Sequence, residues 1–457
     1  MEKSMMVKIA AVVVVVIVVA VACVVIFGGG NKSNPADDIE TQLQIRGNAD
    51  ANYTIDSRDM DIVNDVIAGK KTLKDYPLAD VNGDNKVDET DKKLLQDLID
   101  RKTGTTVYVL CQDVDGEMTT QEVKYPLRNA VTYATNIQLP ALYAGGAPYI
   151  AGYFSRSYTT AAEKGLDSAV DLKGGTRSIT DESWANFTNL DASLRATGGV
   201  GALLVDYSGV KELTDQRMSD LEARGIPALI YSSADAEEEI TTVLTLGFLF
   251  GGDCEKLTVD YAVASWDVLD YIDKTLANKS PKTSYISFNM YVYICQNDST
   301  YNYIGQSAGG IPYYKVNSEF ADKYKGTGSV KMSGPESLSN YTDVGALINI
   351  RSIDWGMTED EIKDMIVKTW EYDSKGVKSQ ECFKGFEDRL FYVDNLLPGA
   401  VKVAYTAHGL YGDLFTEKWA EGVLSDFIKM NLGPLEGQTV HTILPFFDYD
   451  DYKAAKS

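Results

Sequence analysis

Three hydrophobic patterns follow one another along the chain. Residues 9–27 form an unbroken apolar run, residues 44–104 show helical spacing after two acidic loops, and from Thr105 onward short apolar runs alternate with amphipathic stretches. These patterns predict, in the same order, a membrane span, a pair of helices, and a series of strands and helices. The chain is therefore expected to consist of an anchor, a small helical module and a larger α/β body.

The α/β body is expected to have two halves with mainly parallel sheets, because its brief apolar runs alternate with helical stretches. Several runs end at polar or glycine-containing turns, and ligands in open α/β sheets bind just beyond the carboxyl ends of the strands. The expected strands are 106–110, 130–133, 149–152, 202–205, 228–231, 284–290 and 346–350, and helices are expected at 358–371 and 416–432.

One long helix is expected between the two halves. Apolar residues recur at three-and-four spacing from Leu257 to Leu276, neither proline nor glycine interrupts the segment from Asp253 to Lys279, and Pro281 follows it. At 1.5 Å per residue, this helix is about 39 Å long. The expected boundaries are 1–30 for the anchor, 31–43 for a linker, 44–104 for the helical module, 105–252 for the first lobe, 253–281 for the linking helix and 282–457 for the second lobe.

The apolar run at 9–27 is long enough to cross a membrane, since a helix of this length spans roughly 28 Å. Lys3 and Lys8 precede it and an acidic stretch at 37–40 follows it, which places the N-terminus inside and the rest of the chain outside. A cleaved signal peptide is the alternative, with a lipoprotein-like box at 20–23, but the apolar run continues beyond such a cleavage point. We expect a retained, single-pass anchor of archaeal type in the cell membrane.

An acidic loop that begins at Asn48 recurs at Asp80. Both copies carry Asp or Asn at positions 1, 3 and 5 and Asp at position 12, and apolar residues at helical spacing follow each copy. Calcium takes six to eight oxygen ligands, which loops of this kind supply. The alternative is that the acidic loops cap two ordinary helices. The expected calcium ligands are Asn48, Asp50, Asn52 and Asp59 in the first loop and Asp80, Asn82, Asp84 and Asp91 in the second.

Residues 47–102, with their doubled loop and Asp at each twelfth position, resemble a type I dockerin. The resemblance implies a small all-α module with two calcium ions as cofactors and a cohesin-bearing surface protein as partner. Position 6, usually glycine, is Tyr53 in the first loop and Asn85 in the second. Because Tyr tolerates a left-handed backbone poorly, the first site is expected to be the weaker. The partner-selecting positions 10 and 11 hold Ser57 with Arg58 and Glu89 with Thr90, which leaves the partner's identity open.

Short motifs occur in both halves of the body: VKYP at 123–126, GIPALIY at 225–231, PESL at 335–338 and PGAVKVAY at 398–405. With the long helix, they resemble the substrate-binding proteins of iron-siderophore, haem and vitamin B12 ABC importers, over about residues 106–447. The resemblance implies two Rossmann-like lobes that close modestly on a cleft holding a metal chelate or tetrapyrrole. It also implies docking to an ABC permease through one surface acidic residue on each lobe, at positions matched by Asp191 and Glu336.

The candidate ligand-binding residues are mainly aromatic. The chain has 28 tyrosines, several of them near expected strand ends, and aromatic rings give a flat, rigid contact surface for large planar or chelated ligands. Arginine binds carboxylates bidentately, which suits an anionic ligand, and His408 is a candidate cleft residue or axial haem ligand. For each residue the alternative is ordinary packing. The full set is Tyr153, Arg156, Tyr207, Tyr291, Tyr303, Arg351, Trp355, Tyr405 and His408.

Composition excludes several classes of function. The net charge of −23, from 66 acidic and 43 basic residues, disfavours a nucleic-acid partner, which needs a concentrated basic face. The sequence has two histidines, too few for a receptor of bare zinc or manganese. Ser208, which precedes Gly209, lacks the nucleophile-elbow pattern GxSxG, no P-loop occurs, and the five cysteines form no CxxC pair. We therefore expect no catalytic residues and no enzyme activity.

These observations favour a membrane-anchored, extracytoplasmic solute-binding protein that captures an iron chelate (siderophore), haem or corrinoid for an ABC importer. Two alternatives remain open. The chain could be a cell-surface adhesion or scaffold protein that reuses the solute-binding fold, or a surface polysaccharide hydrolase. A large melting shift with a ligand would favour capture, whereas turnover of polysaccharide without such a shift would favour the hydrolase.

Overall fold

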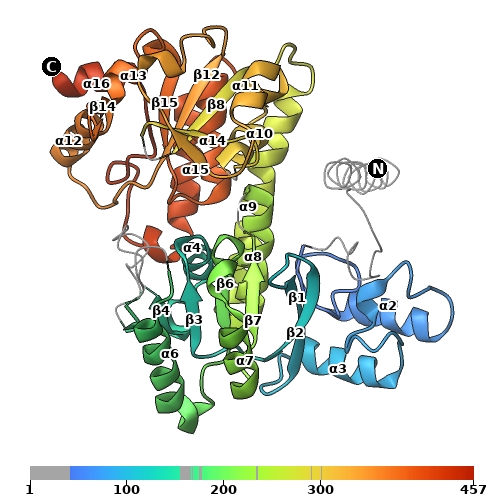
Figure 1. Ribbon diagram of the computed structural model, residues 1–457. Helices are drawn as coiled ribbons and strands as arrows, with labels where there is room; N and C mark the ends of the chain where they lie inside the picture. The colour runs from blue at the N-terminus through green and yellow to red at the C-terminus, as the bar shows by residue number, and fades with distance from the viewer. Residues whose placement is uncertain are drawn as a thin grey trace.

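Two α/β lobes lie at the two ends of one long helix, and a two-helix module lies against the side of the first lobe (Figure 1). The computed structural model describes residues 42–154, 166, 168–173, 178–232, 235–289, 291–299 and 301–457. The anchor expected at 9–27 lies outside these residues. Within the described ranges, every helix is too short or too polar to cross a bilayer.

The first lobe is built on a seven-stranded sheet in the order β2-β1-β7-β6-β3-β4-β5. Strands β7 to β5 in that order are parallel, and β1 and β2 form an antiparallel hairpin at one edge. All residues of β3, β6 and β7 are buried, because helices cover both faces of a parallel sheet. The strands are β1 (Thr106–Gln112), β2 (Met118–Lys124), β3 (Ala130–Tyr133), β4 (Ile150–Phe154), β5 (Val170–Asp171), β6 (Leu203–Asp206) and β7 (Ala228–Tyr231); the helices are α4 (Thr135–Tyr143), α6 (Asp181–Leu194), α7 (Asp215–Arg224) and α8 (Ala236–Phe250).

The linking helix α9 runs over Asp253–Leu276, 24 residues, or about 36 Å. It ends three residues before Lys279, the limit of the uninterrupted segment. Its buried side carries Tyr261, Ile272 and Leu276, and it packs closely on α8 and α14. The helix thus contributes to the cores of both lobes.

The second lobe contains a sheet in the order β11-β9-β8-β12-β15-β16, with β10 beside β8. Strands β8, β12 and β15 are parallel, whereas β9, β11 and β16 are antiparallel to their neighbours. Its strands are β8 (Ser284–Asn289), β9 (Tyr293–Cys295), β10 (Ile311–Pro312), β11 (Ser329–Lys331), β12 (Ala346–Arg351), β15 (Leu390–Asp394) and β16 (Phe446–Phe447), with a separate hairpin of β13 (Asp373–Ser374) and β14 (Val377–Lys378); its helices are α10 (Tyr301–Ser307), α11 (Ser318–Lys323), α12 (Glu359–Trp370), α13 (Ser379–Cys382), α14 (Gly399–Leu410), α15 (Glu417–Lys429) and α16 (Tyr449–Lys456).

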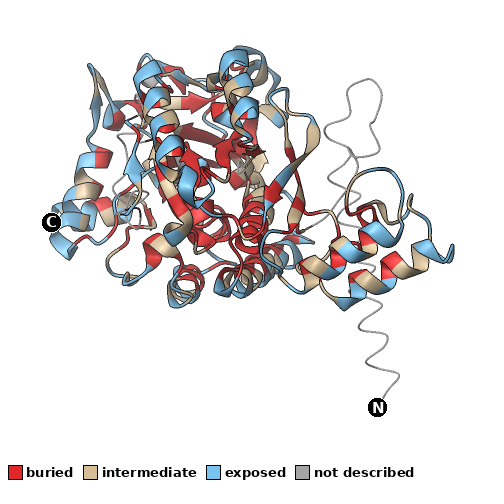
Figure 2. Ribbon diagram, turned by 90° about the horizontal axis from the view of Figure 1, so that it is seen from below, coloured by how far each residue is buried: buried red, intermediate tan, exposed pale blue. Residues whose placement is uncertain are grey.

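Residues 42–104, here called the two-loop module, contain α2 (Ser57–Ile67) and α3 (Glu89–Ile99). Asp56 and Asp88 cap these helices, each in a capping box, which satisfies the free N–H groups of the first turn. The outer faces of the module are exposed, whereas buried residues concentrate in the two lobes (Figure 2). Leu43, Ile45 and Leu95 belong to the same hydrophobic cluster as the first lobe. The module is therefore continuous with that lobe's core.

The expected mixed α/β fold with two sheets is confirmed. The strands lie within one or two residues of their expected positions, as β7 and β12 illustrate. The sequence did not indicate how the two-loop module is attached, because the attachment depends on pairing between distant segments.

Candidate functional site

The loops that follow the parallel strands of the two lobes meet at the interlobe boundary. Helix α8 begins shortly after β7 and α14 shortly after β15, and the two helix starts are joined where the Gly399 N–H donates to Glu239 Oε1 at 2.6 Å. Lys402 Nζ lies 3.5 Å from the other oxygen of Glu239, and the Tyr143 hydroxyl donates to the carbonyl of Leu396. The carboxyl edges of the two sheets therefore face each other, the place where open α/β sheets bind ligands.

Polar residues line this boundary on the first-lobe side. Asp206, which ends β6, accepts a hydrogen bond from the Ser208 N–H at 3.0 Å and one from Asn136 Nδ2 at 3.4 Å. Ser232, which follows β7, donates to Glu238 at 2.5 Å. Asp206 is buried and Glu238 is half-buried, so hydrogen bonds fix two carboxylates at the first-lobe edge.

Tyr303 on α10 of the second lobe lies within electrostatic range of first-lobe carboxylates. Its side chain is half-buried, and burial raises the pKa of its hydroxyl, with further increases from the charges of Glu238 and Asp235 in the first lobe and Asp298 in the second. Carboxylates of both lobes therefore contribute to the raised pKa of this one phenol.

Arg351, Tyr291 and Tyr372 form a three-layered stack at the carboxyl edge of the second-lobe sheet. The Arg351 guanidinium lies 3.6 Å from the centroid of the Tyr291 ring. On its other face, the Tyr291 ring stacks on the Tyr372 ring, with the two ring centroids 3.6 Å apart and the two planes inclined by 11°. Tyr291 has a positive φ of 71°, an uncommon conformation for an aromatic residue, and Asn349 Nδ2 holds its carbonyl at 2.6 Å.

The charge of Arg351 is not matched by a carboxylate within the described part of the chain, where its side chain has neither an ion pair nor a hydrogen bond. The other half-buried or buried arginines of the lobes are engaged, as Arg224 is with Asp191 and Asp220. In a protein of net charge −23, a half-buried arginine without such a partner is a ready site for an anionic group.

The other expected ligand-binding residues of the first lobe do not all lie at the interlobe boundary. Tyr153 in β4 is half-buried on the first-lobe edge and Arg156 lies outside the described residues. Tyr207 follows β6 and is 39% exposed, with its hydroxyl against Gly116 in the β1–β2 turn. The structure thus brings Tyr291, Tyr303 and Arg351 to the interlobe edges, and Tyr207 lies nearer the hairpin.

Trp355 and Tyr405 are buried and do not line an open cleft. Trp355 is 3% exposed, and its indole N–H donates to Asp394 Oδ2 at 2.6 Å. Burial raises the pKa of Asp394 to about 7, against the opposing effect of hydrogen bonds from Leu396, Trp355 and Ile353. Tyr405 is 1% exposed and its ring is 6.2 Å from that of Phe446. Both side chains stabilise the core of the second lobe.

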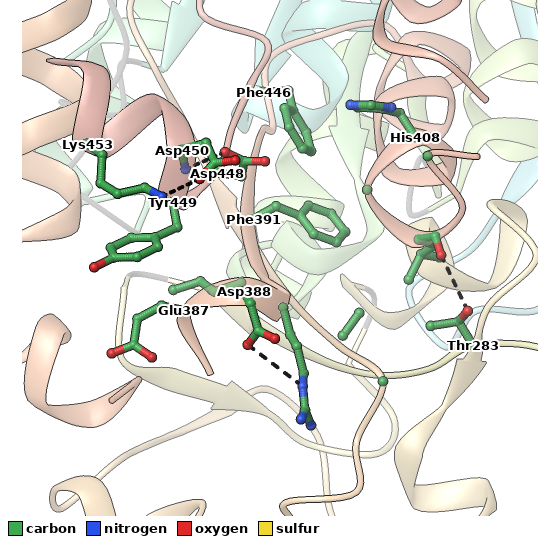
Figure 3. A pocket seen from close by; sticks show the side chains of 17 residues that line it. Thr283, Glu387, Asp388, Phe391, His408, Phe446, Asp448, Tyr449, Asp450 and Lys453 are labelled. Carbon is green, nitrogen blue, oxygen red and sulfur yellow. Dashed lines mark hydrogen bonds and ion pairs between the residues drawn. The ribbon is translucent and has the colours of Figure 1, made fainter. Parts of the chain in front are cut away.

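His408 lies at the opposite edge of the second-lobe sheet, in a pocket of about 460 Å³. The pocket lies at the amino ends of β8, β12 and β15, and Figure 3 shows His408 beside Phe446 and above Phe391. Its Nδ1 lies 2.8 Å from the carbonyl of Phe415, and its ring packs edge-on against Phe446. The expected role at the cleft is not supported by this placement.

The two expected docking carboxylates differ. Asp191 is 2% exposed and bonds to Arg195 Nη2 at 3.0 Å, Arg224 Nη1 at 3.2 Å and the Val200 N–H at 3.1 Å. Burial raises the pKa of this carboxyl, but these donors outweigh it and the net pKa is lowered. Asp191 is therefore a structural anion and not a surface carboxylate, because its arginine partners enclose it. Glu336 is exposed, as a docking residue requires.

The second acidic loop folds around its first and twelfth residues. Asp80 accepts hydrogen bonds from the N–H groups of Asp84 and Asn85, both at 3.0 Å, and Asp91 accepts from Val81 at 2.8 Å and Asp88 at 2.9 Å. Asn85 at position 6 is left-handed, with φ 64°. The loop side chains Asn82 and Asp84 bond to each other at 3.3 Å.

The first loop has the same plan with a different turn. Asp59 accepts from the Asp50 N–H at 3.1 Å and the Asp56 N–H at 2.8 Å, and Asn48 and Asn52 are joined at 2.8 Å. Its left-handed residue is Ala51 at position 4, with φ 56°, and Tyr53 at position 6 is not left-handed. The turn that glycine usually makes is therefore absent from the first loop.

The donor set of these loops fits calcium. All the expected ligand residues supply oxygen atoms. Asp59 and Asp91 are fully buried, and burial raises the pKa of Asp59 to about 7. Two buried carboxylates are costly without a cation. Within the described residues, no three or more Asp, Glu, His or Cys side chains are grouped so that they could hold a metal ion.

The sequence analysis did not single out Tyr372 or Asn349. Tyr372 follows α12 and carries no local signal for a contact with Tyr291, which lies after β8. Asn349 lies between the apolar residues Ile348 and Ile350 of β12 and is fully buried. A buried amide in a central strand is unusual, and this is the signal that would have identified it.

Solved periplasmic solute-binding proteins share this fold. A TroA-like periplasmic binding protein, FepB from Veillonella parvula, is 14% identical, with a TM-score of 0.52 over 74% of this chain and 99% of its own. A periplasmic solute binding protein from Veillonella parvula DSM 2008 (14% identity, TM-score 0.48, 74% and 97% covered) and an ABC transporter solute binding protein from Sulfurospirillum deleyianum DSM 6946 (14%, 0.48, 71% and 95%) are also similar. No protein-family model matches the chain, and no curated protein sequence is significantly similar.

Proposed function

We propose that the chain is a solute-binding protein that captures a metal chelate, haem or a related tetrapyrrole between its two lobes and delivers it to an ABC importer. The likeness to periplasmic solute-binding proteins supports the general role. The proposal assigns no chemical reaction to the chain, because capture and release need only a cleft that binds and opens.

The Arg351–Tyr291–Tyr372 stack is the observation that carries the proposal. Its half-buried guanidinium lies at the carboxyl edge of the second-lobe sheet and has no carboxylate partner among the described residues. An anionic chelate or a propionate-bearing macrocycle supplies the missing negative charge. The phenol of Tyr303 and the acidic edge of the first lobe then face the remainder of the ligand.

Membrane attachment completes the proposed capture role. The apolar run at 9–27, with lysines before it and acidic residues after it, supports a single-pass anchor with the lobes outside the cell membrane. The exposed Glu336 is the proposed contact with the permease on the second lobe. Asp191 is not proposed as its counterpart, because it is enclosed by arginines.

Calcium binding by the two-loop module is the second part of the proposal. Asn48, Asp50, Asn52 and Asp59 would hold one ion, and Asp80, Asn82, Asp84 and Asp91 the other. Bound calcium would neutralise the buried carboxylates. The exposed positions Ser57, Arg58, Glu89 and Thr90 support recognition of a cohesin-bearing surface protein.

A panel of ferric siderophores, haem and cobalamins tests the capture role. Thermal unfolding of the full chain, with native mass spectrometry of the same mixtures, is expected to identify at least one ligand that binds and raises the melting temperature. A ligand present at 100 times its dissociation constant stabilises the folded state by about 2.7 kcal/mol. Binding by none of these ligand classes would contradict the proposal.

A further inference from the structure

The attachment of the two-loop module to the first lobe is built from main-chain pairing. Ile45 forms an antiparallel bridge with Val109 of β1, the Arg46 N–H donates to the Tyr108 carbonyl at 2.9 Å, and the Leu110 N–H donates to the Gln44 carbonyl at 2.9 Å. Residues 44–46 therefore pair with β1 on the side opposite β2, where β1 contacts β7 at Gln112 alone within the described strands. A flexible adaptor on a linker would not share a sheet with the domain it carries.

Arg101 ties the first acidic loop to the linking helix. Its Nε donates to Glu255 on α9 at 2.8 Å, and its Nη2 donates both to Glu255 and to the Ile55 carbonyl, the latter at 3.1 Å. The same guanidinium lies 4.8 Å from the Phe248 ring of α8. Ile55 directly follows Thr54, whose backbone carbonyl occupies the seventh loop position, a calcium-ligand position.

Arg46 ties the second acidic loop to the edge of the sheet. Its Nη1 donates to the Asp80 carbonyl at 3.0 Å and lies 3.5 Å from Asp80 Oδ2. Its Nε donates to Thr120 Oγ1 in β2 at 3.4 Å. Asp80 is the first residue of that loop, so one arginine contacts both a proposed calcium ligand and the first lobe.

The remaining contacts between the module and the first lobe also involve α8 and α9. The Trp266 indole N–H on α9 donates to Gln42 Oε1 at 2.9 Å, and the Gln44 N–H donates to Thr245 Oγ1 on α8 at 3.1 Å. Apolar residues of the module join the core of the first lobe beneath these contacts. The two-loop module therefore contacts β1, β2, α8 and α9 directly.

We propose that the two-loop module is a built-in calcium-responsive part of the solute-binding domain, in which Arg101 and Arg46 transmit loop occupancy to the linking helix and to the edge of the first-lobe sheet. The inference rests on the calcium binding proposed above and not on the identity of the captured ligand. Calcium then orders the first lobe itself, in addition to any effect on an external partner.

Hydrogen exchange of the full chain, with calcium or with EGTA, tests this inference, and calorimetry measures calcium binding separately. At calcium ten times its dissociation constant, exchange in β1 and in the first turns of α9 should slow about tenfold, since a ligand that binds only the closed form lowers opening by 1 + [L]/Kd. Exchange in β15 of the second lobe should change little. Calcium binding that slows exchange only within residues 42–104 would overturn the inference, and an absence of calcium binding would remove it together with the calcium part of the proposed function.

Three variants separate transmission from binding. Arg101→Gln should still bind calcium but lose the calcium-dependent slowing in α9, and Arg46→Gln should lose it in β1 and β2. Lys102→Gln is the matched control, because Lys102 is the cation next to Arg101 in the sequence and pairs with Asp97 inside the module. Full retention of the calcium effect in α9 of Arg101→Gln and in β1 of Arg46→Gln would exclude both arginines as the transmitting residues and overturn the proposal. Capture of the transported ligand is measured independently, so its failure leaves this test intact.

Discussion

Buried carboxylates decide several assignments at the scale of single residues. Asp191 and Asp394 are nearly or fully inaccessible, and each is surrounded by hydrogen-bond donors. Neither is free for an external partner, because a buried charge is tolerated only where it is paired and hydrogen-bonded. Arg351 differs, since it is half-buried and stacked on Tyr291 with no matching carboxylate among the described residues.

Asp191→Asn should destabilise the chain at neutral pH by about 1–3 kcal/mol, the typical result of disturbing a charged hydrogen-bond network. The folded-state pKa of Asp191 is lowered, so its contribution is fully present above the unfolded-state pKa of about 4 and is lost as the pH falls through the folded-state value. Denaturant unfolding at a series of pH values should show the variant and the parent converging in acid. A constant difference across that range would contradict this assignment.

Trp355→Phe removes the indole donor to Asp394 and should destabilise the second lobe by about 1–3 kcal/mol at pH 8. The folded-state pKa of Asp394 is raised to about 7, so this group makes the protein less stable as the pH rises from about 4 through 7. The indole N–H favours the charged form, so its loss should cost more at pH 8 than at pH 5. Thermal unfolding at both values measures this. Reduced ligand affinity with unchanged stability would instead favour a direct ligand role for Trp355.

At the scale of elements, the spacing of apolar residues predicted the helices and strands whose formation depends on residues close in the sequence. The helices after the acidic loops, the long helix and the buried strands β3, β6 and β7 all carry their pattern in adjacent residues. Pairings between distant segments carry no such pattern. The bridge from Ile45 to Val109 and the stacking of Tyr372 on Tyr291 depend on the assembled fold. The interlobe edge was therefore predictable in position, whereas its residue contacts were only partly predictable.

The two acidic loops should differ in calcium affinity. The second has left-handed residues at Gly83 and Asn85, whereas the first has one at Ala51 and none at Tyr53. Asp91→Asn should therefore abolish the tighter of two calorimetric binding events, and Asp59→Asn the weaker, because each removes a position-12 carboxylate. Loss of the tighter event in Asp59→Asn would reverse this order. Lys93→Gln, an exposed change on α3, should leave both events unchanged.

At the scale of the whole molecule, the two lobes and the two-loop module share one continuous structure. Helix α9 connects the lobes, contacts the module through Glu255 and Trp266, and packs on α14 of the second lobe. The interlobe boundary is joined through Glu239, Gly399 and Lys402. Changes in either lobe or in the module therefore reach the same helix, which is the expected arrangement for a protein that closes modestly on a ligand.

The affinity of the full chain for the siderophore, haem or cobalamin that it binds best, compared between the parent and Arg351→Gln, tests the central claim most directly. Loss of a charge-assisted contact predicts a dissociation constant about 10- to 100-fold higher in this variant. Lys363→Gln, which changes an exposed cation of the same lobe paired with Glu359, should bind as the parent does. Equal affinity in all three proteins, or no binding by the parent, would contradict capture at the interlobe edges.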